Sequence, residues 1–188
     1  MVYEKLIREA VHHGLDISEK PMTPAMKGLY ADGVIWINKN IPTKAEKTCI
    51  LAEELGHYHT TEGDILDQSK IKNRKQELRA RTWAYEKLIP LSSIVQAHKQ
   101  GFQNRYDLAE YLGVTEEFLD SAIKRYKEKY GLFASVDGYT VCFEPLGVIE
   151  FFDFDVYEAD KPLLEKKYVI LKRTNKLSRM NPLPRIRT

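Results

Sequence analysis

The sequence contains few cysteines and no long apolar run. Its 188 residues include only two cysteines, Cys49 and Cys142, which are far apart. Two distant cysteines give neither a disulfide framework nor a repeated metal-ligand pair. No stretch approaches the roughly 18–20 apolar residues that a membrane span needs. The N-terminus also lacks the basic segment followed by an apolar stretch that is typical of a signal peptide. We therefore expect a cytoplasmic protein that does not contact a membrane.

Charge is unevenly distributed along the chain. The formal net charge is +2, but eight basic residues and no acidic residue follow Glu165. A basic tail of this kind could contact nucleic acid or an acidic partner. It could equally be a solvated end that keeps the protein soluble, and the sequence leaves both alternatives open.

Hydrophobic spacing and turn residues predict an α+β fold. An Asp-Gly pair at Asp32 and Gly33 indicates a β-hairpin, and Thr43 with Glu46 matches the capping box that starts a helix. A second strong helix ends before Pro90. The expected helices cover residues 2–13, 44–60, 74–88, 91–100, 105–112 and 115–129, with an extended segment over 15–22 and strands from Gly131 onward, including 148–156.

Four parts are expected along the chain. The first is a core in which a small sheet packs on two helices, and a helical segment, a small β region and the basic tail follow it. Their expected ranges are 1–92, 93–130, 131–171 and 172–188.

The helix over residues 44–60 carries a pattern that is typical of a metal site. Glu53 and His57 are four residues apart and therefore share one face of the helix, with Glu54 beside them. This is the geometry of H-E-x-x-H, in which two ligands flank a carboxylate that acts as a base. Glutamate stands at the first ligand position, and carboxylate oxygen is also a metal ligand. Glu77 on the next helix is the candidate third ligand.

Other interpretations of these residues remain open. Adjacent glutamates on a helix are usually a solvated face, but buried carboxylates repel each other unless a cation is present. Several further side chains are weaker candidates: His59 as a ligand, His12, His13 and His98 as surface residues, Cys49 as a buried thiol, and Tyr58 and Tyr85 as packing residues that could also supply a hydroxyl.

Two segments resemble the ImmA/IrrE family of metallopeptidases. Residues 49–57, Cys-Ile-Leu-Ala-Glu-Glu-Leu-Gly-His, are similar to the active-site helix of that family. Residues 77–90 resemble its E-x-x-A-x-x-F-A-x-x-L-L-x-P helix, from which Trp83 and Lys87 depart. The resemblance implies a zincin-like metallopeptidase core, with Glu53, His57 and Glu77 as metal ligands and Glu54 as the general base.

The same resemblance implies a cofactor and a substrate. The cofactor is one divalent ion, Zn²⁺ in the first place and Mn²⁺ as the alternative, because Glu53 stands where the family usually has histidine and makes the site harder. The implied activity is endopeptidase cleavage of a helix-turn-helix repressor of a phage or mobile element. The alternative is a catalytically impaired regulator that binds the repressor through the same fold.

Residues 107–119 have the spacing of a helix-turn-helix. The start of the second helix offers Glu116, Glu117 and Asp120, which DNA phosphates would repel. We interpret the segment as packing or as a surface for a protein partner, and we do not expect direct DNA binding. The strand over residues 34–38 is expected to be an edge strand that could hold the substrate by strand addition.

Overall fold

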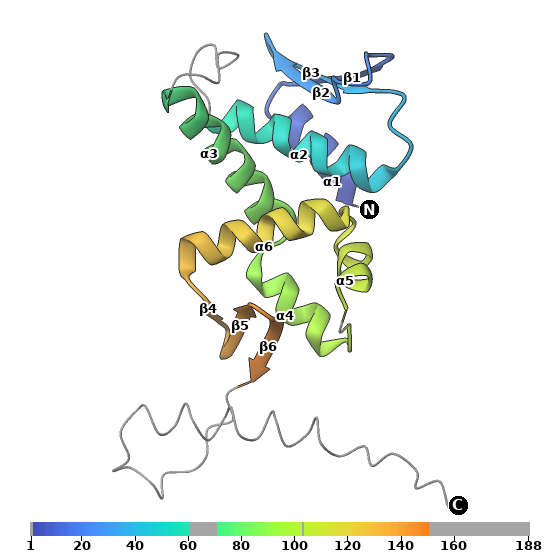
Figure 1. Cartoon of the computed structure of the whole chain (residues 1–188). Coiled ribbons are helices and arrows are strands. Elements are labelled where there is room, and N and C mark those ends of the chain that lie inside the picture. The colour runs from blue at the N-terminus through green and yellow to red at the C-terminus, as the bar shows by residue number, and fades with distance from the viewer. Residues whose placement is uncertain (1, 61–70, 103, 151–188) are drawn as a thin grey trace, which may run out of the picture. The chain divides into compact units, whose positions relative to one another are not determined.

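The computed structural model describes residues 2–60, 71–102 and 104–150 (Figure 1). Within these ranges the chain forms helices and two small sheets, which confirms the α+β class. The helices are α1 (Val2–His12), α2 (Lys44–Thr60), α3 (Ile71–Leu88), α4 (Leu91–Lys99), α5 (Arg105–Leu112) and α6 (Glu116–Tyr130). The strands are β1 (Asp16–Lys20), β2 (Gly28–Ala31), β3 (Val34–Asn38), β4 (Phe133–Val136), β5 (Tyr139–Phe143) and β6 (Leu146–Glu150).

The N-terminal sheet has the strand order β1-β3-β2, with β1 parallel and β2 antiparallel to β3. The expected hairpin between β2 and β3 is confirmed, because Asp32 and Gly33 both have positive φ, at 50° and 78°. The expectation that residues 34–38 form an edge strand is wrong. Parallel pairing with β1 covers the other side of β3, and local sequence patterns do not reveal such a pairing. The edges of this sheet are β1 and β2.

The side chain of Asn38 organises the connection into β2. It is buried, and its amide nitrogen donates to the backbone carbonyl oxygens of Met22, Thr23 and Met26 at 3.0–3.3 Å. Its carbonyl oxygen accepts a hydrogen bond from the Met22 amide at 3.2 Å. These bonds hold the residues that precede β2 and so fix where Gly28 begins the strand.

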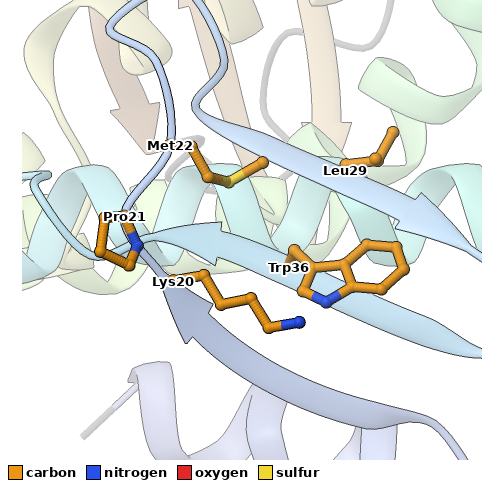
Figure 2. A pocket seen from close by; sticks show the side chains of 5 residues that line it. All are labelled: Lys20, Pro21, Met22, Leu29 and Trp36. Atoms are coloured by element: carbon orange, nitrogen blue, oxygen red, sulfur yellow. The ribbon is translucent and has the colours of Figure 1, made fainter.

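The two faces of this sheet have different roles. Ile35 and Ile37 are fully buried and belong to the same core cluster as the apolar side chains of α2. Because side chains alternate along a strand, Trp36 points to the opposite face. There it lines a shallow hollow together with Lys20, Pro21, Met22 and Leu29 (Figure 2). The Lys20 ammonium lies 5.4 Å from the centroid of the Trp36 ring.

Helices α5 and α6 form the helix-turn-helix that the sequence indicates, and they pack into the core. Gly113 ends α5 in the left-handed conformation, with φ 71°, and Thr115 caps α6 by accepting a hydrogen bond from the Phe118 amide. Both helices bury an apolar face against the rest of the molecule. The buried residues are Leu108, Ala109, Leu112, Phe118, Leu119, Ala122, Ile123 and Tyr126.

Some expectations fall partly or wholly outside the described residues. Strand β6 covers the start of the strand expected over 148–156, and the rest of that strand, the basic tail and the boundary expected at 171/172 lie beyond the described ranges. Helix α3 begins at Ile71, three residues earlier than expected. In the described part of the chain, no helix combines the length and apolar character that crossing a membrane requires.

Candidate metal centre

Helix α2 presents Glu53, Glu54 and His57 from its third and fourth turns. Its start is capped as the sequence indicates, because the Thr43 hydroxyl accepts a hydrogen bond from the Glu46 amide at 3.1 Å. The apolar residues between these turns are buried in the core, namely Cys49, Ile50, Leu51, Ala52 and Leu55. Burial of that face fixes the rotation of the helix and leaves the three polar side chains half-buried at the edge of the core.

Close packing of α2 on α3 brings the second helix to the site. A Cβ atom at Gly56 would lie only 2.3 Å from the backbone oxygen of Ala80. Glycine therefore lets the two backbones approach further than any other residue would. Figure 1 shows that α2 and α3 lie against each other. His57 follows Gly56 directly, and Glu77 lies one turn before Ala80, so this crossing brings the two candidate ligands together.

His57 and Glu77 meet across the two helices. The Nε2 atom of His57 lies 3.4 Å from Oε2 of Glu77. The other oxygen of Glu77 accepts from Nε of Arg81 at 2.6 Å, an i,i+4 pair on α3. Burial lowers the pKa of His57, while the Glu77 carboxylate opposes that shift. The imidazole is therefore held toward its neutral form, which is the form that binds a metal ion.

Glu54 lies under strand β2. A Cβ atom at Gly28 would be 2.7 Å from Oε1 of Glu54, so the absence of a side chain at Gly28 makes room for this carboxylate. The backbone amide of Tyr30 donates a hydrogen bond to it. Burial raises the pKa of Glu54 to about 7, the charge of Glu53 adds to the rise, and the bond from Tyr30 opposes it. A carboxyl group with this pKa can both take and release a proton near neutral pH.

Glu53 lies beside these groups but is not drawn into a tight cluster with them. Burial raises its pKa, the Arg81 guanidinium opposes the rise, and the Glu77 carboxylate adds to it. Among the described residues, three potential ligands whose donor atoms all lie within 4.8 Å of one another are Glu9, His13 and His59. The donor atoms of Glu53, His57 and Glu77 do not all lie within 4.8 Å of one another.

The residues present fit a divalent metal ion. An imidazole and a carboxylate already face each other, and both are donors that Zn²⁺ accepts. The three carboxyl groups of Glu53, Glu54 and Glu77 outnumber the two basic groups that act on Glu53, which are Arg81 and Lys27. A bound cation would offset the remaining negative charge.

Sequence reasoning missed two contributors to this site. Arg81 could have been found, because an arginine four residues after a glutamate on a helix is a standard ion pair. The contacts of Glu54 with Gly28 and Tyr30 join segments that are distant in sequence, and no local pattern indicates them. Of the weaker candidates, Tyr85 packs on Phe118 and Tyr58 on Tyr30, as expected of packing residues.

Comparison with known families shows which family the chain belongs to. The model of the IrrE N-terminal-like domain, the M78 peptidase family, matches residues 10–124, which is more than half of the chain. The chain belongs to this family. The resemblance to the ImmA/IrrE metallopeptidases is thereby confirmed, and membership implies a metallopeptidase-type function and a divalent metal. The M78 match runs from the end of α1 into α6 and crosses the boundary expected at 92/93. Comparison with curated proteins and with solved structures found no match.

Proposed function

We propose that this M78 family member is a metal-dependent endopeptidase that cleaves a helix-turn-helix repressor of a phage or mobile element. The observation that carries the proposal is the position of Glu54. It lies next to the His57–Glu77 pair on one side and accepts the backbone amide of β2 on the other. The repressor as substrate rests on the resemblance to ImmA-like members.

Glu53, His57 and Glu77 are the residues that would hold the ion, Zn²⁺ in the first place and Mn²⁺ as the alternative. A divalent ion supplies Lewis acidity toward the scissile carbonyl and lowers the pKa of water. The hydrogen bond that Nε of Arg81 donates to one oxygen of Glu77 holds that oxygen and leaves the other directed at His57. Arg81 is therefore a positioning residue for Glu77.

Glu54 is the proposed general base. It takes the proton of the attacking water and passes it to the amine of the leaving peptide. Burial favours its neutral, proton-carrying form, and the amide of Tyr30 favours its ionised form, which leaves its pKa at about 7. The buried carboxyl group can thus hold the proton between its removal from water and its transfer to the leaving amine.

Strand β2 is the proposed support for the substrate backbone. It is an edge of its sheet, and its Gly28 and Tyr30 contact Glu54. An extended peptide that adds to this edge would pass beside the base, because added strands align through backbone hydrogen bonds. This assigns to β2 the role that the sequence had suggested for residues 34–38.

The test is cleavage of a repressor encoded next to this gene. We expect the wild type with Zn²⁺ or Mn²⁺ to cleave it and Glu54→Gln to lose at least about a hundredfold in rate, the usual contribution of a general base. Glutamine still accepts the Tyr30 amide, so the variant should keep its fold and its metal. Glu46→Gln is the matched control, because Glu46 lies on the same helix but pairs with Lys27. Equal rates for Glu54→Gln and the wild type would exclude the role of Glu54.

The alternative is a catalytically impaired regulator that binds the repressor. Glutamate at position 53 favours it, because a site with two carboxylates and one imidazole weakens the ion as a Lewis acid. Under this alternative, wild type and Glu54→Gln bind the repressor equally and neither cleaves it with any added divalent ion.

A further inference from the structure

A second set of potential metal ligands lies where the ends of α1 and α2 meet. Glu9 belongs to α1, His13 follows its last turn, and His59 is in the last turn of α2. The His13 amide donates to the Glu9 carbonyl oxygen at 3.1 Å, so the two side chains share one face. One donor atom from each of Glu9, His13 and His59 lies within 4.8 Å of the others.

The three donors have the chemistry of a transition-metal site. Two imidazoles and one carboxylate are a donor set that binds Zn²⁺. Ligand atoms at about 2.1 Å from one tetrahedral ion lie about 3.4 Å apart, so donor atoms that lie within 4.8 Å of one another need to approach by at most about 1.4 Å. His13 and His59 are exposed, and small side-chain rotations can supply this movement.

Two residues of α3 shape this cluster. The Trp83 ring stacks on His59, with centroids 4.7 Å apart and an angle of 28° between the planes, which fixes the orientation of the imidazole. The Lys87 ammonium lies 2.7 Å from both carboxylate oxygens of Glu9. The Glu9 carboxylate is therefore already paired with a positive charge. A metal ion bound to Glu9 would lie next to the Lys87 ammonium or displace it.

Trp83 and Lys87 lie one turn apart on α3, and each contacts one member of the cluster, His59 and Glu9 respectively. His59 lies two residues after His57 and therefore about 200° round the helix from it, so the cluster is separate from the His57–Glu77 pair.

We propose that Glu9, His13 and His59 form a second site for a divalent transition-metal ion, with Zn²⁺ as the ion that the donor set favours. A bound ion would join the end of α1 to the last turn of α2, the turn that follows His57. This proposal does not depend on the peptidase activity, because its three ligands are not among the residues proposed for catalysis.

The experiment counts ions on tag-free, full-length protein. Co²⁺ and Zn²⁺ are titrated by calorimetry and by the visible absorption of bound Co²⁺, in the wild type and in the variant His57→Ala/Glu77→Ala. We expect His13→Ala, His13→Gln and His59→Gln each to remove one bound ion per chain from the wild type. In the double variant the same changes should weaken the remaining binding by at least about tenfold, because removing a ligand costs at least as much as removing an outer contact.

His12→Ala is the matched control. His12 is exposed and adjacent to His13 but outside the group of three, so its loss should leave both ions bound. Lys87→Met should tighten binding by up to about fivefold, because it frees Glu9 from a surface ion pair. Binding that is equally affected by His12→Ala and His13→Ala, or equal ion counts for wild type and His13→Gln, would overturn the proposal. If the wild type bound both ions but did not cleave the repressor, this result would contradict only the proposed function and not the second metal site.

Discussion

Glu53 adds a carboxylate to the site at the position where the family pattern has an imidazole. Burial raises the pKa of this carboxyl group, the Arg81 guanidinium opposes the rise, and the Glu77 carboxylate adds to it. The chain thus combines an extra acidic group with a nearby basic group on α3. The Arg81 guanidinium offsets part of the negative charge that Glu53 adds to the site.

Glu53→His tests the consequence for metal preference. The substitution restores two imidazoles on one face of α2, and nitrogen donors favour Zn²⁺ over the harder Mn²⁺. We expect Zn²⁺ affinity to rise by about tenfold or more, which is about 1.4 kcal/mol, and Mn²⁺ affinity to rise less or fall. Competition titrations with a chelating dye measure both.

Glu53→Gln separates the ligand effect from the charge effect. Glutamine removes the negative charge without adding an imidazole, so it should weaken the binding of both ions. If Glu53→Gln and Glu53→His changed Zn²⁺ affinity in the same direction and to the same extent, Glu53 would not be a ligand.

At the scale of secondary structure, the crossing of α2 and α3 decides whether the site exists. Gly56 is the point of closest approach, with the Ala80 carbonyl oxygen where a Cβ would be. The Thr60 hydroxyl also donates a hydrogen bond to the carbonyl oxygen of Gly56, at 2.7 Å. There is no space into which a larger residue could move without displacing a helix backbone.

Gly56→Ala should therefore separate the two helices. We expect a loss of about 1–3 kcal/mol in the free energy of unfolding, the usual cost of overpacking a core, even though alanine favours a helix. Metal affinity should fall with it, because His57 and Glu77 would no longer meet. Gly147→Ala is the control, since no atom lies within 4 Å of its Cβ position. Stability of Gly56→Ala equal to that of Gly147→Ala would contradict this packing.

The elements also show how far sequence reasoning reaches. The capped start of α2 and the Asp32-Gly33 hairpin depend on residues within a few positions of each other, so local patterns were enough to predict them. The central position of β3 depends on pairing with β1, and the contact of Glu54 with Gly28 depends on how the sheet lies on α2. Both are tertiary, and neither leaves a periodic signal in the sequence. The cluster of Glu9, His13 and His59 was missed for the same reason, because it requires the packing of α1 on α2.

At the scale of the whole described region, one hydrophobic cluster runs from α1 to β5. It includes buried side chains of α5 and α6, so the helix-turn-helix segment is part of the same core as the candidate site. The family match, which continues to residue 124, agrees with this. A surface for reading DNA would need a basic start of α6, and that start carries the exposed residues Glu116 and Glu117.

Tyr126 connects α6 to the end of α3 through a hydrogen bond from its hydroxyl. Removing this hydroxyl tests how strongly the two helices are coupled. The hydroxyl donates to the backbone oxygen of Ile89 at 2.8 Å, and both residues are almost fully buried. Tyr126→Phe keeps the ring but leaves a buried carbonyl group without this donor, which costs about 1–3 kcal/mol. We expect Tm to fall by a few degrees in one unfolding transition followed by circular dichroism. Tyr106→Phe is the control, because Tyr106 is 61% exposed and its hydroxyl is solvated. An equal Tm for both variants, or a second transition in the Tyr126 variant, would show that α6 is not coupled to α3 through this bond.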